Sequence, residues 1–153
     1  MTARLIVYID LDNTIVDFPS SFERLEQRVH DEYDGRMDEV PGIFALMDPL
    51  PGAIEAFHAL AEVYDVYILS TAPWLNPSAW SDKLEWVQRH FGTDEGTPAW
   101  KRLILSHHKN LNRGDYLIDD RPNNGAAQFE GEWLHFGPGN AYETWADVLE
   151  RLL

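Results

Sequence analysis

One short run, residues 5–14 (LIVYIDLDNT), constrains the fold more than any other segment of the chain. It is apolar and β-branched up to Ile9 and then turns acidic at once, with Asp10 followed two positions later by Asp12. An uninterrupted apolar run of this kind is typical of a strand buried on both faces of a parallel sheet. Because open α/β sheets bind ligands at the carboxyl ends of their strands, the two carboxylates predict a site for a divalent metal and a phosphate.

Two simpler interpretations of this acidic pair compete with a site. An EF-hand calcium loop needs Gly at its sixth position and Glu at its twelfth. Counting from Asp10, those positions hold Ile15 and Ser21, so a calcium loop is excluded. The pair could also cap a helix or lie in a solvated turn. Other strand-like runs of the chain also end in polar residues, and this argues against that interpretation.

The composition narrows the class of protein. With 153 residues, we expect residues 1–153 to form a single domain with one core. The chain has no cysteine, which excludes disulfides, thiolate metal ligands and a thiol nucleophile. Without a membrane-length apolar run or a signal-peptide pattern, we expect a cytoplasmic protein with no membrane partner. The net charge of −14 argues against a nucleic-acid polymer as partner and requires local cations at any anion site.

Strand-like and helical patterns alternate along the chain. The apolar strand-like runs are residues 4–9, 65–69, 102–105, 115–118 and 132–136. Three helical patterns lie between and after these runs. The first starts at Pro51-Gly52, the second covers residues 80–91 and the third covers residues 141–153. This alternation predicts a Rossmann-like α/β fold, with a central parallel sheet flanked by helices on both sides.

The helical patterns also predict which side chains face the core. In the first helix we expect the inward residues to be Ile54, Phe57 and Leu60. In the next they are Trp80, Leu84, Val87 and Phe91. In the last, with Asn140 as the expected N-cap, they are Trp145, Val148, Leu149 and Leu152. We assign these stripes to the core and give them no function.

Residues 18–47 do not fit the alternation. They mix apolar side chains with charges and are interrupted by Pro41-Gly42. We interpret them as a small helical cap inserted after the first strand, too short to be an independent domain. In that position the cap would overhang the acidic strand end as a lid.

Polar residues follow three further strand-like runs. Ser70 and Thr71 follow residues 65–69, Lys109 comes after residues 102–105, and Asp119 and Asp120 follow residues 115–118. Each group alone has an ordinary explanation, such as a strand-end turn or a solvated lysine. Adjacent carboxylates, however, repel each other unless a cation lies between them and other groups. Because parallel strand ends share one edge of a sheet, we expect all of these groups to meet Asp10 and Asp12.

The order Asp-x-Asp-x-Thr, Ser-Thr, Lys, Asp-Asp resembles the haloacid-dehalogenase (HAD) superfamily of phosphohydrolases. Within it, the sequence is most similar to the 5′(3′)-deoxyribonucleotidases. The matching segments are residues 10–18, 49–56, 65–71, 86–92, Lys109 and 117–122. The resemblance implies a Mg²⁺-dependent phosphatase that acts on a (deoxy)nucleoside monophosphate.

The resemblance also implies roles for the acidic residues. Asp10 would be the nucleophile that forms an aspartyl-phosphate. Asp12 would protonate the leaving oxygen and then accept a proton from water. Mg²⁺ would be bound by the Asp10 carboxylate, the Asp12 backbone carbonyl and an acid of the 119–120 pair. Asp120 is favoured as the direct ligand with Asp119 in support, and this choice stays open.

For the substrate, the resemblance implies that Ser70, Thr71 and Lys109 bind the phosphoryl oxygens. Phe18 matches a position whose ring contacts the nucleotide base. The cap is shorter than in the animal enzymes and lacks their further aromatic cluster. His107 stands where the family has an arginine, and we expect His107 and His108 to be solvated loop residues. These departures concern specificity and leave the phosphatase chemistry untouched.

Other functions remain as alternatives. The same chemistry could serve a sugar phosphate or another small metabolite. A protein of a different class, a non-catalytic HAD-fold protein that binds metal or a partner, would keep the same residues. A receiver-type signalling module has a different chain order, because its phosphoacceptor lies alone on a later strand. Oligomeric state and the choice between 5′ and 3′ phosphates stay open at this point.

Overall fold

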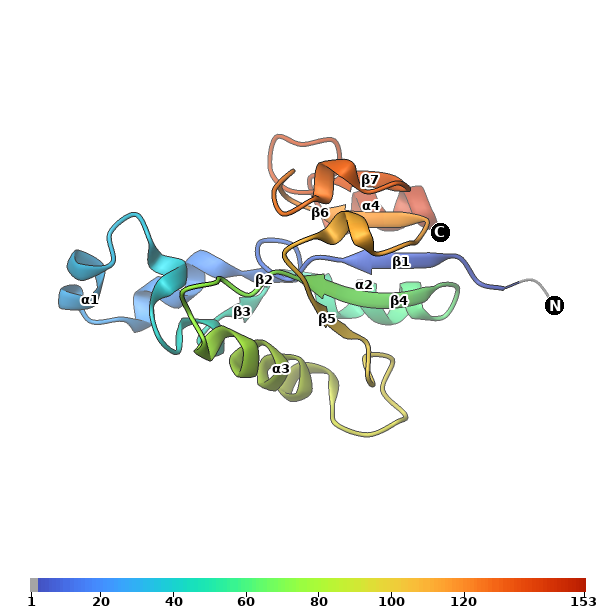
Figure 1. Cartoon of the computed structure of the whole chain (residues 1–153). Helices are drawn as coiled ribbons and strands as arrows, with labels where there is room; N and C mark the ends of the chain where they lie inside the picture. Colours follow the sequence, from blue (N-terminus) through green and yellow to red (C-terminus); the bar gives the residue numbers. More distant parts are fainter. Residues whose placement is uncertain (1–2) are drawn as a thin grey trace.

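A computed structural model describes residues 3–153, and its centre is a five-stranded parallel sheet in the order β5-β4-β1-β6-β7 (Figure 1). The strands are β1 (Ile6–Ile9), β4 (Asp65–Ser70), β5 (Leu103–Leu105), β6 (Tyr116–Asp119) and β7 (Glu132–His135). Each expected run gives one strand, so the predicted sheet is confirmed. In the central strand, Ile9 pairs with Ile68 of β4 and with Ile118 of β6, which places the three strand ends side by side.

The two faces of the sheet are covered differently. One core contains side chains of β1 together with the helices α2 (Ala53–Ala61), α3 (Ser78–Phe91) and α4 (Trp145–Leu152). A smaller core on the other face is closed by Ala126 of the short 3₁₀ segment η5 (Ala126–Gln128) and by Phe129, and the 3₁₀ segment η4 (Lys109–Leu111) lies next to η5. There Phe129 packs edge-on against Tyr8, with ring centroids 5.9 Å apart. Full helices therefore flank one face of the sheet, whereas the other face carries short 3₁₀ segments where the sequence analysis expected helices on both sides.

Helix α3 is rotated from its predicted orientation. Val87 and Phe91 are buried as expected, but Trp80 and Leu84 are 44% and 46% exposed, so these two assignments were wrong. The buried face carries Lys83 instead, which is fully buried and forms an ion pair inside the protein. A lysine on the inward face breaks the apolar periodicity on which the prediction rested.

Helix α4 begins later than its pattern indicated. Thr144 is the N-cap, and its hydroxyl accepts from the Asp147 backbone N–H in a reciprocal capping box. The expected N-cap, Asn140, was wrong, since its side chain instead donates to the Phe136 carbonyl at 2.7 Å. The capping box satisfies two otherwise free backbone N–H groups, which favours this start. The predicted inward residues Trp145, Val148 and Leu152 are buried.

Residues 18–47 leave and rejoin the core through a two-stranded antiparallel sheet of β2 (Val16–Asp17) and β3 (Asp48–Pro49). They contain η1 (Phe18–Arg24), α1 (Gln27–Glu32), η2 (Met37–Glu39) and η3 (Ile43–Ala45). This segment, called the cap below, projects beyond the carboxyl ends of the parallel strands (Figure 1). Among residues 3–153, none of the helices is long and apolar enough to span a membrane.

Candidate active site

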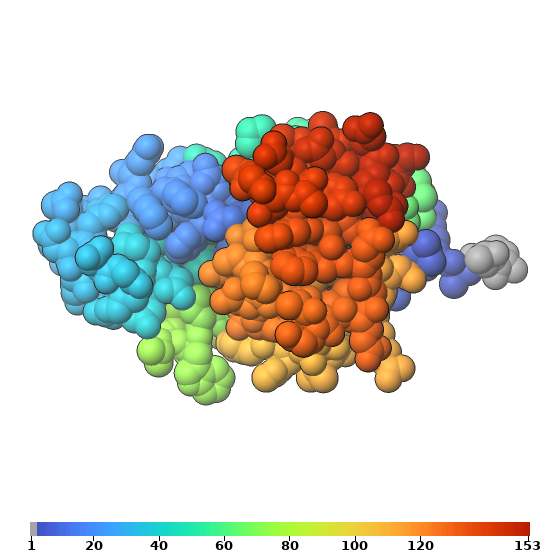
Figure 2. All heavy atoms as spheres, turned by 90° about the horizontal axis from the view of Figure 1, so that it is seen from above, coloured from blue at the N-terminus to red at the C-terminus, as the bar shows by residue number. Residues whose placement is uncertain are grey.

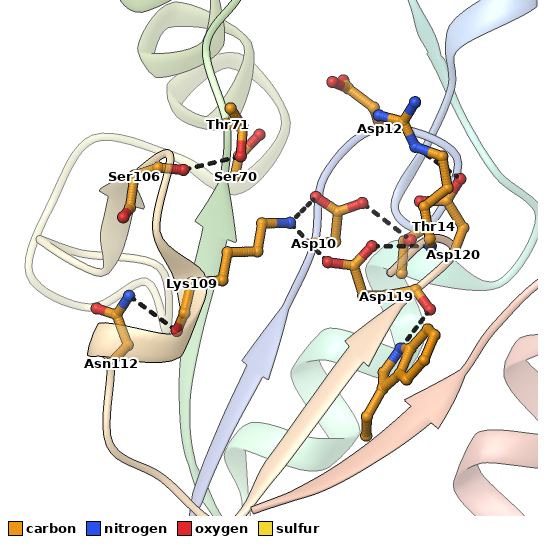
Figure 3. A network of polar contacts seen from close by, with 12 residues as sticks. Asp10, Asp12, Thr14, Ser70, Thr71, Ser106, Lys109, Asn112, Asp119 and Asp120 are labelled. Atoms are coloured by element: carbon orange, nitrogen blue, oxygen red, sulfur yellow. Dashed lines mark hydrogen bonds and ion pairs between the residues drawn. The ribbon is translucent and has the colours of Figure 1, made fainter. Parts of the chain in front are cut away.

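The carboxyl ends of β1 and β6, together with the start of η4, place three charged groups in one buried cluster (Figure 3). The Lys109 ammonium lies 2.8 Å from Asp10 Oδ1 and 2.6 Å from Asp119 Oδ2. Asp10 follows β1 directly, while Asp119 is the last residue of β6 and Lys109 begins η4. Three segments far apart in the sequence therefore meet at a single ammonium group.

The cluster holds three carboxyl groups and one ammonium group. Carboxylate oxygens of Asp10, Asp119 and Asp120 all lie within 4.8 Å of one another. Burial and the neighbouring Asp10 charge raise the pKa of Asp119 to about 7 and the pKa of Asp120 to about 8. Burial also opposes the charge on Asp10, but the Lys109 ammonium outweighs it and lowers the Asp10 pKa. Three converging hard oxygen donors with one local cation fit a Mg²⁺ ion.

Asp12 is bound by a residue that the sequence analysis missed. The Lys83 ammonium lies 2.8 Å from Asp12 Oδ2 and 2.8 Å from the Ser70 hydroxyl oxygen, and above the Phe44 ring at 4.4 Å. Burial raises the pKa of Asp12 against the opposing pull of Lys83. The second oxygen, Asp12 Oδ1, is buried without a hydrogen-bond partner in the described chain. The sequence does place Lys83 at helical spacing from Ala79 and Trp86, and this spacing could have indicated an inward position. A lysine within a helix is normally taken to be solvated.

The two predicted hydroxyl groups lie in different surroundings. Thr71 is half-buried, donates to the Ser106 carbonyl at 2.8 Å and lines the cavities beside Asp12. Ser70 is fully buried, and its hydroxyl accepts from Lys83. The structure therefore brings Thr71 to the space in front of the carboxylates and Ser70 to the layer behind it.

Two adjoining cavities open at this sheet edge. The smaller, of about 20 Å³, is lined by Asp10, Asp12, Thr71, Lys109, Asp119, Arg121, Asn123 and Asn124. The larger, of about 690 Å³, lies between the core and the cap and shares Asp12, Thr71, Arg121 and Asn124 with the smaller. Its volume is within the range of about 300–1,000 Å³ typical of small-molecule sites. In Figure 2 the cap is a separate lobe beside the core.

Aromatic side chains surround the larger cavity. Phe18 lines it and stacks on Phe44, with ring centroids 5.4 Å apart and planes inclined by 27°. His107 is half-buried between Trp74 and Trp80, at centroid distances of 5.8 and 6.3 Å. The expectation that His107 is a solvated loop residue was therefore wrong, because these indoles shield it. His108 is exposed as expected.

Strand β7 anchors the backbone of the second acidic pair. Trp133 Nε1 donates to the Asp119 carbonyl at 3.0 Å, and His135 Nε2 lies 2.9 Å from the Asp120 carbonyl. The Arg121 backbone N–H also donates to Asp119 Oδ1 at 3.2 Å. Both carboxylates thus extend from a backbone that is fixed on two sides.

The sequence of this chain is similar to those of known proteins. Residues 36–148 match the family "5′ nucleotidase, deoxy (Pyrimidine), cytosolic type C protein". A Vibrio phage KVP40 protein named 5′(3′)-deoxyribonucleotidase is 53% identical over 99% of this chain and 86% of its own length. The mitochondrial 5′(3′)-deoxyribonucleotidase of Mus musculus is 29% identical over 97% of this chain and 85% of its own.

Solved structures support the fold. A HAD hydrolase from Bacillus subtilis bound to magnesium aligns with a TM-score of 0.66 at 14% identity, covering 99% of both chains. A HAD-superfamily hydrolase from Geobacter sulfurreducens aligns with a TM-score of 0.63 at 13% identity, over 98% of this chain and 97% of its own. The fold expected from the motif order is therefore confirmed.

Proposed function

Because this chain belongs to the deoxyribonucleotidase family of HAD-superfamily phosphatases, we propose that it hydrolyses (deoxy)nucleoside monophosphates through an aspartyl-phosphate on Asp10. One observation carries the proposal: the Asp10 carboxylate, held by Lys109, faces a cavity that is continuous with a space large enough for a nucleoside. Four lining residues, Asp12, Thr71, Arg121 and Asn124, are common to the two spaces.

Mg²⁺ is the cofactor that the donor set fits. The Asp10 carboxylate, the Asp12 backbone carbonyl and Asp120 would hold the ion, with Asp119 in support. When bound, the ion offsets the charge of the carboxylates and of the phosphoryl oxygens. The convergence of three carboxylates within 4.8 Å supports this assignment, as does the magnesium in the related Bacillus subtilis hydrolase.

The first step transfers the phosphoryl group to the protein. An Asp10 carboxylate oxygen bonds to phosphorus, and the bond from phosphorus to the ester oxygen breaks. Asp12 gives its proton to that oxygen, which leaves as the nucleoside hydroxyl. The raised pKa of Asp12 favours the protonated form that this step requires. Lys109 and Thr71 border the space for the phosphoryl oxygens and would bind them there.

The second step returns Asp10 to its starting form. Asp12, now a carboxylate, takes a proton from water while the water oxygen attacks phosphorus. The bond between phosphorus and the Asp10 oxygen then breaks, and inorganic phosphate leaves. Lys83 keeps the Asp12 carboxylate oriented throughout. Ser70 was predicted to bind phosphate, and its contact with Lys83 supports a positioning role behind Asp12 instead.

The substrate assignment rests on the larger cavity. Phe18 and Phe44 give it a flat apolar wall, and Asn13 and Asn124 offer polar groups beside it. A nucleoside has this combination of a flat ring and a polar sugar. The observations therefore support a small phosphorylated metabolite, with a nucleoside monophosphate as the best fit.

An activity panel tests the proposal. Phosphate release is measured with dUMP, dTMP, other nucleotides and sugar phosphates, with and without Mg²⁺. We expect Mg²⁺-dependent turnover with the highest kcat/KM on a deoxynucleoside monophosphate. A higher kcat/KM on sugar phosphates would transfer the assignment to a metabolite phosphatase. Mg²⁺ binding without turnover on any ester would favour a non-catalytic protein.

A further inference from the structure

The two walls of the larger cavity come from separate parts of the molecule. The cap contributes residues 37–39 of η2, and the segment after β4 contributes Pro73, Trp74 and Leu75. Trp74 is 81% exposed, so it forms an open rim and is not part of a core. The shape of the cavity therefore depends on how the η2 wall is held against this segment.

Asn76 directly joins the two walls. Its side-chain amide Nδ2 donates to the Asp38 carbonyl at 2.9 Å and to the Val40 carbonyl at 3.0 Å. Asn76 is 1% exposed and follows the rim residue Leu75 in the chain. One amide group therefore uses both of its N–H bonds to hold the backbone of the cap.

Ser78 completes the connection at the start of α3. Its hydroxyl donates to Asn76 Oδ1 and accepts from the Gly42 backbone N–H at 3.0 Å. Together, Asn76 and Ser78 provide the side-chain hydrogen bonds that reach residues 38–42 from the core in the described chain. The neighbouring η3 and the residues after it are held by other bonds from α3, because Arg89 Nη1 donates to the Ala45 carbonyl at 3.3 Å and Trp86 Nε1 donates to the Met47 carbonyl at 2.8 Å.

We propose that Asn76 is a positioning residue that fixes the η2 wall against the 73–75 rim and thereby sets which leaving groups the cavity accepts. The inference rests on the proposed function, because it concerns the leaving group of the same phosphatase. Asn76 does not line either site cavity, so it acts through the walls and not by contact with substrate. Val40 and Ile43 anchor the cap in the core by apolar packing, and the Asn76 bonds fix the position of the 38–40 backbone because buried hydrogen bonds are costly to leave unmade.

The test compares a nucleotide with a shorter ester. In Asn76→Asp, a carboxylate oxygen would face the two cap carbonyls and break both contacts. We expect kcat/KM for dUMP to fall about tenfold more than kcat/KM for phenyl phosphate, mainly through KM. Ser78→Ala is the milder variant, with a loss of selectivity of about threefold. Asn140→Asp is the matched control, because Asn140 also donates to a backbone carbonyl, Phe136 O, but away from the cavity.

Amide hydrogen exchange gives a readout that is independent of activity. Residues 37–42 should exchange faster in Asn76→Asp and in Ser78→Ala, while helix α4 should be unchanged. Equal losses on both substrates, or unchanged exchange at residues 37–42 in a folded variant, would overturn the inference. A wild-type protein without preference for nucleotides would instead refute the proposed substrate, and the exchange result would still decide the role of Asn76.

Discussion

The strand-end cluster lines the smaller cavity and the cap wall lines the adjoining larger one, and the two regions are held by different interactions. The cluster depends on buried charges, with Lys109 between Asp10 and Asp119. The cap wall is held by neutral hydrogen bonds from Asn76 to two backbone carbonyls, next to the buried apolar side chains of Val40 and Ile43. Paired buried charges are very costly to break, whereas neutral bonds are weaker individually. This difference indicates that chemistry and selectivity can be changed separately.

The largest expected effect is at the cluster. Asp10→Asn removes the attacking oxygen but keeps the shape of the side chain, so we expect turnover to fall by at least about 10³-fold on every ester. The measurement is phosphate release under saturating substrate and Mg²⁺, with the melting temperature as the control for folding. Retained turnover on any ester would show that the cluster does not supply the nucleophile.

Lys83 belongs to both regions, because it pairs with Asp12 of the cluster and lies over Phe44 of the cap. Lys83→Met keeps the length of the side chain but leaves Asp12 unpaired. We expect kcat to fall about 10²-fold and the free energy of unfolding to fall by about 3 kcal/mol. Chemical denaturation measures the second effect. A change in KM alone would show that Lys83 acts through the cap and not through Asp12.

A smaller effect is expected at the aromatic wall. Phe18→Ala removes a ring that lines the cavity, and we expect KM for dUMP to rise about fivefold with little change in kcat. Phe22 packs edge-on against Phe18 but does not line the cavity, so Phe22→Ala is the matched control. An equal rise in KM in both variants would mean that cap packing, and not ring contact, matters.

The smallest effect concerns pH and metal. The folded pKa values of Asp119 and Asp120, about 7 and about 8, lie above the ordinary carboxyl value of 3.8. The folded state therefore binds more protons between about pH 4 and pH 8, and stability is lost as pH rises through this window. Without metal, we expect the melting temperature to fall by about 3–6 °C from pH 6 to pH 8.

Mg²⁺ supplies the control for this measurement. Metal binding requires the charged carboxylates, so the ion should reduce the fall and should bind more tightly at pH 8 than at pH 6. Calorimetry with and without Mg²⁺ measures both quantities. A melting temperature that rises with pH in the metal-free protein would contradict the raised pKa values.

Much of the fold could be predicted because its signals are local. The strands β1, β4 and β6 each contain an uninterrupted apolar run, and parallel strands must align their ends at one edge. For that reason Asp10, Lys109 and Asp119 could be expected together from their positions alone. The start of α4 was misplaced because two capping signals compete there, and only the Thr144 signal has a partner at the correct spacing.

The sequence by itself determined the order of strands and helices and the set of polar groups that meet at the sheet edge, since both follow from patterns within a few residues. Only the tertiary structure decided that Lys83 turns inward and that Asn76 holds the cap. A buried lysine and a buried amide carry no apolar signal, because each is stabilised by partners that are distant in sequence. Those partners, Asp12 for one and the Asp38 and Val40 carbonyls for the other, exist only after the chain has folded.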